Sequence, residues 1–203
     1  MRGVAFISRV FAALLLATAI HARAADIMVH DANLRATDEG LVLNAEFRFD
    51  FPAALAEAVV SGVPLYFVFE FDLTRRRWYW FNEHPVSKQM QVRLSYHALS
   101  RHYRLSTGVL QQNFATLEEA LSVLRRLQNW LVVDRTLSLT DATYDAAVRM
   151  RLDTSLLPKP FQVSALTSRD WQFESEWKVF PFRPPQQPPA PVESREPKEA
   201  TER

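Results

Sequence analysis

Apolar and polar residues alternate along most of the chain, and a period of two predicts β-strands. In residues 41–51 every second side chain is apolar, from Leu41 through Phe47 to Phe51. The same alternation recurs in residues 90–96, 131–139, 144–152 and 171–179. Strands with one apolar face are typical of antiparallel sheets whose other face meets solvent. Residues 63–73 are apolar on both faces, which favours a central strand.

Two segments break this period and predict helices. Residues 52–61 begin with a proline and are followed by Gly62, which is the usual asymmetry of helix ends. Thr116 and Glu119 form a capping-box pattern, and the leucines that follow it recur at helical spacing as far as Leu127. We therefore expect a mainly β protein, an antiparallel β-sandwich of about seven to nine strands with two α-helices at about 52–61 and 116–128.

The first 24 residues have the pattern of an export signal. Arg2 and Arg9 provide a positive start, residues 10–20 are apolar, and a small-x-small pattern ends at Ala24. The apolar run is too short to span a bilayer comfortably, so we expect cleavage between Ala24 and Ala25 and no transmembrane segment afterwards. These features predict a periplasmic protein.

Composition narrows the class of protein further. Without residues 1–24 the chain has 21 basic and 23 acidic residues, a net charge of −2, which argues against nucleic-acid binding. Cysteine is absent, which excludes disulfides and thiol catalysis. Residues 183–203 are rich in proline and lack apolar periodicity, so we expect a disordered tail after a single domain at 25–182. We expect the mature protein to be a monomer.

Known catalytic motifs do not occur in this sequence. It contains no Gly-x-Ser-x-Gly elbow, no His-Glu-x-x-His and no glycine-rich phosphate loop. His97 and His102 would need further ligands such as Glu83 or His84 to hold a metal, and ordinary loop histidines explain them more simply. The carboxylates, including Glu174 on the final strand, are scattered. We predict no catalytic residue, no metal site and no cofactor.

The strongest local anomaly is a run of three arginines followed by four aromatic residues. A strand would direct Trp78 and Trp80 to one face and the other two aromatics to the opposite face, so one core cannot hold all four. Either both faces are covered, or the aromatics form an exposed surface that binds a polypeptide, glycan or anionic headgroup. The candidate partner-binding residues are Arg75, Arg76, Arg77, Trp78 and Trp80.

Two neighbouring features bear on this anomaly. Residues 72–74 resemble a hairpin turn, and hairpin tips often carry recognition residues. Arg149 and Arg151 lie on the polar face of the strand at 144–152, and we expect Asp145 and Asp153 on the same face to neutralise them.

Several motifs in order resemble the family called domain of unknown function 4390. In the first half they are GVPLYF at 62–67, RWYW at 77–80 and LSYHAL at 94–99. In the second half they are FATLEEAL at 114–121, RLD at 151–153, LLPKP at 156–160, DW at 170–171 and SEW at 175–177. The resemblance implies an exported protein of Gram-negative proteobacteria, without an assigned activity. It also implies an accessory of envelope signalling, because members are often encoded beside a sensor kinase.

These observations favour a non-catalytic periplasmic interaction module that binds a protein of the cell envelope. An alternative is a carrier or sensor of a small apolar ligand, held between the sheets or under the helix at 116–128. A further alternative is a hydrolase whose site forms only in three dimensions. An internal apolar pocket would favour the carrier, and clustered carboxylates would favour the hydrolase.

Overall fold

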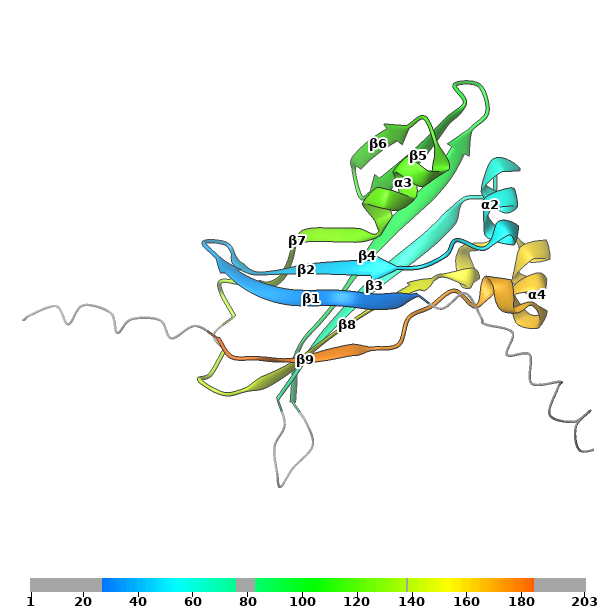
Figure 1. Cartoon of the computed structure of the whole chain (residues 1–203). Helices are drawn as coiled ribbons and strands as arrows, with labels where there is room; N and C mark the ends of the chain where they lie inside the picture. The colour runs from blue at the N-terminus through cyan, green and yellow to red at the C-terminus, as the bar shows by residue number, and fades with distance from the viewer. Residues whose placement is uncertain (1–26, 76–82, 138, 185–203) are drawn as a thin grey trace, which may run out of the picture.

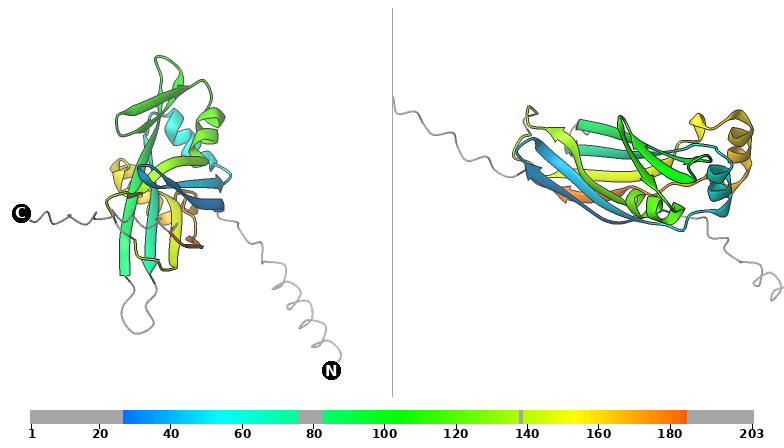
Figure 2. Two further views of the ribbon diagram at one scale, coloured as in Figure 1. Left: turned by 90° about the vertical axis from the view of Figure 1, so that its left-hand side faces the viewer. Right: turned by 90° about the horizontal axis from the view of Figure 1, so that it is seen from above.

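A computed structural model describes residues 27–75, 83–137 and 139–184, and these residues form two antiparallel sheets (Figure 1). The larger sheet has the order β6-β5-β4-β3-β8-β9 and the smaller has the order β1-β2-β7. Figure 2 shows the smaller sheet lying across the larger one. The mainly β, antiparallel sandwich predicted from the sequence is confirmed. The predicted signal peptide and residues 185–203 of the predicted tail lie outside the described residues.

The predicted periodicity matches β2, β3 and β8 closely and β4, β7 and β9 in part, whereas β1, β5 and β6 were not predicted. The smaller sheet contains β1 (Met28–Thr37), β2 (Gly40–Arg48) and β7 (Arg126–Asp134). The larger sheet contains β3 (Leu65–Arg75), β4 (Glu83–His97), β5 (His102–Thr107), β6 (Leu110–Phe114), β8 (Tyr144–Leu152) and β9 (Lys178–Phe182). As predicted, β3 is central, because it pairs with β4 on one side and β8 on the other.

Phenylalanines fill the space between the two sheets. Phe67, Phe69 and Phe71 alternate along β3 on the inner face and are at most 2 % exposed. Phe69 meets Phe47 of β2 edge-on with 5.3 Å between ring centroids, and Phe67 meets Phe173 at 6.2 Å. Edge-to-face pairs at these distances add to the free energy gained from burial. This part of the core is closely packed.

The first two helices confirm one prediction and correct part of another. The helix α2 (Ala53–Val60) lies within the predicted segment and is followed by Gly62 at φ 89°. The helix α3 (Leu117–Leu124) has the predicted capping box between Thr116 and Glu119. It ends before residue 128, since β7 starts at Arg126 and pairs there with Glu46 of β2. Strand pairing therefore overrides the helical spacing of the last leucine.

A third helix, α4 (Lys159–Thr167), was not predicted from the sequence. Pro158 precedes it, and Ala165 is its one buried residue, so it lacks the apolar stripe that marks an amphipathic helix. Two single-turn helices, η1 (Thr154–Leu156) and η2 (Arg169–Trp171), flank it.

Three other expectations are wrong in detail. Residues 72–74 form no turn, because β3 continues through them to Arg75. The predicted strand at 131–139 ends at Asp134, after which the chain turns. The alternation at 171–179 spans η2 and an extended segment, and β9 begins only at Lys178. In the last two cases local periodicity extends beyond the residues that find a strand partner, and in the first case strand pairing continues through the predicted turn.

Candidate functional site

The Arg-aromatic segment falls mostly outside the described residues. Arg75 is the last residue of β3 and pairs with Glu83, the first residue of β4. Arg76, Arg77, Trp78 and Trp80 lie in the undescribed segment that joins these strands, as Ala24 and Ala25 lie in the undescribed N-terminus. Partner binding at this segment therefore stays a prediction.

The two histidines of the sequence pattern meet at one end of β4. His97 and His102 are register partners across β4 and β5, and the ring of His102 contacts the carbonyl oxygen of Ser100. Glu83 and His84 lie at the opposite end of β4, roughly 40 Å away at the rise of an extended strand. They cannot complete a metal site with the histidines. Among the described residues, no group of three or more His, Asp or Glu could hold a metal ion.

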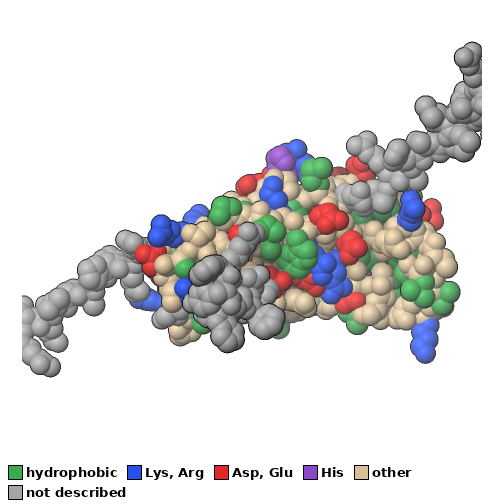
Figure 3. All heavy atoms as spheres, turned by 90° about the horizontal axis from the view of Figure 1, so that it is seen from below, with side chains coloured by type: hydrophobic (Ala, Val, Ile, Leu, Met, Phe, Trp, Pro, Cys, Tyr) green, Lys and Arg blue, Asp and Glu red, His purple; other side chains and the backbone are tan. Residues whose placement is uncertain are grey.

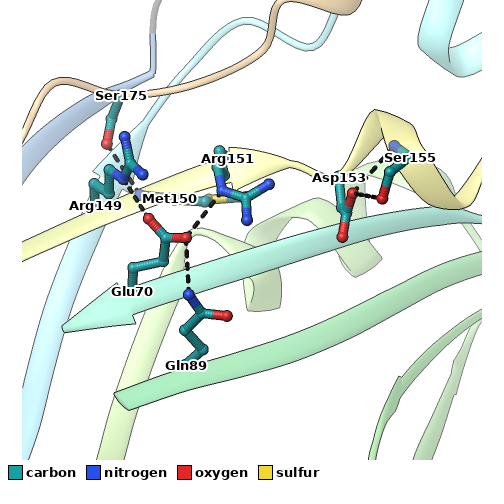
Figure 4. A network of polar contacts seen from close by, with 8 residues as sticks. All are labelled: Glu70, Gln89, Arg149, Met150, Arg151, Asp153, Ser155 and Ser175. Atoms are coloured by element: carbon teal, nitrogen blue, oxygen red, sulfur yellow. Dashed lines mark hydrogen bonds and ion pairs between the residues drawn. The ribbon is translucent and has the colours of Figure 1, made fainter. Parts of the chain in front are cut away.

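Among the described residues one carboxylate is buried, and the sequence had not identified it. Glu70 is 6 % exposed on the outer face of β3, where its Oε1 accepts hydrogen bonds from Arg151 Nε at 3.0 Å and Gln89 Nε2 at 3.2 Å (Figure 4). Its Oε2 accepts one from Arg149 Nε. Donors therefore engage both oxygens, which is typical of a structural ion pair rather than of a catalytic acid or base.

This network corrects the expectation of charge neutralisation for one of the two aspartates, Asp153. The carboxylate that contacts both Arg149 and Arg151 comes from the neighbouring strand, in the cross-strand register that joins Glu70 to Arg149. Asp153 instead accepts hydrogen bonds from the backbone and hydroxyl of Ser155, at 3.1 and 2.6 Å, and caps η1 (Figure 4). Periodicity places a residue on a face but does not identify its partner across strands.

A groove with apolar walls opens where the larger sheet extends beyond the smaller one. The helix α3 contacts β5, β6 and β7 at this overhang (Figure 1). Between α3 and the inner face of the sheet lies a groove of about 230 Å³. Its apolar lining comprises Phe69, Met90, Val92, Leu105, Leu110, Val123, Leu124 and Leu127. The remaining lining residues are Thr107, Gln112, Arg126 and Gln128.

The rim of the groove exposes large apolar side chains to solvent. Leu110 is 71 % exposed and Val123 is 40 % exposed, although both line the groove. Val109, next to Leu110 at the start of β6, is 96 % exposed. Single exposed apolar residues are ordinary, but an apolar rim around an apolar groove is typical of a binding surface.

The helix that covers the groove is attached firmly to the smaller sheet. Arg125 is the single residue between α3 and β7, and its Nη2 donates to the carbonyl oxygen of Phe49 at 3.3 Å. Its guanidinium lies 4.9 Å from the centroid of the Phe49 ring and also contacts Glu118 of α3. These contacts hold the C-terminal end of α3 against the end of β2.

A second groove, polar and about 500 Å³, lies on the outer face of the smaller sheet. Arg35 Nη2 donates to Asn129 Oδ1 at 3.0 Å, and the Asn129 backbone N–H donates to Asn44 Oδ1 at 2.9 Å. Asn129 has φ 52° at an irregularity in the pairing of β2 with β7. Arg126, Leu127 and Gln128 line both grooves, so the two grooves meet at the start of β7.

Charges of opposite sign are interspersed on the face that lies at the bottom of the molecule in Figure 1. The space-filling view of this face shows basic and acidic side chains next to one another (Figure 3). Interspersed charges of this kind favour solubility over attraction to a polyanion.

The comparisons identify a family. A sequence model described as domain of unknown function (DUF4390) matches residues 24–181. The chain belongs to the DUF4390 family. No curated protein and no solved structure matches the chain. The family resemblance found in the sequence motifs is thereby confirmed, and the DUF4390 description assigns no activity that could be transferred to particular residues.

The described part of this DUF4390 protein contains no helix long and apolar enough to cross a membrane. Sequence reasoning named the region under the helix at 116–128 as a possible ligand site, but it did not single out the residues that line it. Leu105, Leu110 and Val123 look like ordinary strand and helix apolar residues. Only their position at the overhang of the larger sheet distinguishes them from the core.

Proposed function

We propose that this DUF4390 protein is a non-catalytic periplasmic binding protein that carries or senses a small apolar ligand in the groove under α3. The single observation that carries this proposal is the groove itself, with eight apolar residues among its twelve lining residues. Export of the chain is supported by the signal pattern at residues 1–24.

The chemistry of the lining supports binding over catalysis. The residues that line the groove include no carboxylate and no histidine, so they provide no general acid or base and nothing to activate the hydroxyl of Thr107 as a nucleophile. Glu70, the buried carboxylate, lies on the other face of the same sheet and is engaged by two arginines. The alternative of a hydrolase therefore has no constellation of residues in this groove.

The volume limits the size of the ligand. An apolar cavity of about 150 Å³ is known to stay dry and to bind benzene. A groove of about 230 Å³ is therefore suited to one ring or a short alkyl segment. A larger ligand would leave its remaining part outside, over the exposed Leu110 and Val123.

Binding of linear alcohols to the mature protein tests the proposal. We expect 1-octanol to shift the backbone amide NMR signals of β5, β6 and α3 more than those of β1 or α4. From 1-pentanol upward, each added methylene should tighten binding about fourfold, which corresponds to about 0.8 kcal/mol, until the groove is full.

A blocking variant and a matched control make the test specific. Val123→Trp on α3 should cover the groove and weaken octanol binding at least about tenfold. Val60→Trp adds the same side chain at an exposed position of α2 and should leave binding unchanged. Failure of octanol to bind, or equal binding by both variants, would show that the groove is not a ligand site.

A further inference from the structure

Part of the rim of the apolar groove adjoins another groove instead of bulk solvent. At the first residues of β7 it meets the polar groove, and Arg126, Leu127 and Gln128 belong to the lining of both. A ligand lying across this strand would have an apolar part on one side and a polar part on the other. The junction therefore fits an amphiphile better than a hydrocarbon.

Arg126 gives this junction a positive charge. The guanidinium is exposed, and no ion pair joins it to another side chain among the described residues. Its register partner on β2 is Glu46, whose carboxylate contacts Arg48 Nε at 3.7 Å. A guanidinium presents five N–H donors and is charged at every physiological pH, so it is suited to an anionic oxygen.

The residues of the polar groove indicate what kind of head group an amphiphilic ligand would have. Arg35 holds Asn129 Oδ1, which leaves the Asn129 Nδ2 group as a donor without a hydrogen bond to another described residue. Asp31 and Glu46 line the same groove. The charged lining residues are two acids and two bases, so the groove provides no excess of cations for a polyanionic head, whereas one anionic group can lie at Arg126.

We infer that the ligand is an anionic amphiphile with a single charge, such as a carboxylate on an alkyl chain. Its tail occupies the groove under α3, and its carboxylate lies at Arg126. This inference rests on the proposed function, because the tail uses the same groove. The experiment separates the inference from the proposed function by changing the head group of the probe while keeping its alkyl tail constant.

The experiment compares octanoate, 1-octanol and octylammonium as probes by titration calorimetry of the mature protein. We expect octanoate to bind roughly fivefold more tightly than octanol, as an exposed ion pair of up to about 1 kcal/mol allows, and octylammonium to bind least. The preference for octanoate should shrink as salt concentration rises, because exposed charges are screened.

Arg126→Gln should abolish the preference for octanoate, so that the affinities for octanoate and octanol become equal. Arg169→Gln removes an exposed arginine on η2, outside the lining of both grooves, and should change neither. Equal affinities for octanoate and octanol, or a preference that survives in Arg126→Gln, would overturn the inference while the apolar site stands. Absence of binding by all three probes would overturn both proposals.

Discussion

Two parts of the larger sheet differ in what covers their inner face. Over β3 and β8, the smaller sheet brings Phe47 and its neighbours into contact, and phenylalanine rings meet at 5–6 Å. Over β5 and β6, an eight-residue helix is the cover, and a groove of about 230 Å³ is left under it. An apolar face therefore becomes closely packed core or the wall of an open groove according to what packs on it.

The largest effect should come from opening the filled part. Phe67→Ala removes a fully buried ring and should lower the free energy of unfolding by about 3–5 kcal/mol. Leu105→Ala in the groove wall should cost about 2 kcal/mol, since this side chain lacks neighbours on the groove side. Urea unfolding monitored by circular dichroism measures both. Equal losses would mean that the groove wall is as closely packed as the core.

The Arg-aromatic segment, which joins β3 to β4, is a third region where aromatic residues are either core or surface. The docking hypothesis holds that this segment is an exposed surface that binds a partner. It predicts that Trp78→Ala and Trp80→Ala each weaken partner binding by about 2 kcal/mol or more and barely change the melting temperature. If the tryptophans are core residues, each substitution should instead cost about 3–5 kcal/mol of stability. A pull-down from envelope extract and a thermal melt of each variant separate the outcomes. A large loss of stability in both variants would end the docking hypothesis.

The outer face of the larger sheet allows a test of buried against exposed charge. Glu70→Gln leaves two partly buried guanidiniums facing a neutral amide, and we expect a loss of about 2–3 kcal/mol in unfolding free energy. Glu118→Gln is the matched control, because its carboxylate also contacts an arginine but is 73 % exposed. Its loss should stay below about 1 kcal/mol. Similar losses in the two variants would mean that the Glu70 network contributes no more than a surface pair.

Because β2 and β7 approach closely at Gly40, we expect Gly40→Ala to lower the free energy of unfolding by about 2 kcal/mol. Gly40 has φ 142°, and a Cβ there would lie 2.0 Å from the carbonyl oxygen of Val133. Gly40→Ala must therefore displace backbone as well as strain it. Gly108→Ala, with nothing within 4 Å, carries only the conformational cost of about 1 kcal/mol. Thermal melts of the two variants should differ, and equal melting temperatures would contradict the close approach.

The smallest effect is expected from the C-terminal tail. A chain ending at Phe182 loses the Arg183–Asp141 contact, whose two side chains are at least half exposed. Such pairs contribute about 0.2–1 kcal/mol, so the melting temperature should fall by no more than a few degrees. A drop of more than about 5 °C would show that further residues of the tail pack on the domain.

Much of the fold follows from periodicity, whereas the candidate site does not. The face of each side chain on β8, and the capping box at Thr116, are local properties that the sequence displays directly. The end of α3 at Leu124 depends on β2, and the partner of Arg149 depends on β3. The groove forms because the larger sheet extends beyond the smaller one. The pattern of a single segment does not show how far the two sheets extend relative to each other. Local patterns therefore predicted the elements, and long-range pairing determined the site.

The attachment of α3 by Arg125 affects how fast a ligand is expected to enter and leave the groove. Because α3 is joined to β7 through a single residue and Arg125 contacts Phe49, we expect the helix to stay in place when a ligand enters. Entry through the solvent-exposed rim then requires no preceding conformational step, so association should be limited by diffusion and orientation rather than by gating. A weakly bound alkyl probe should exchange rapidly, with amide signals that move continuously during titration instead of splitting into free and bound sets.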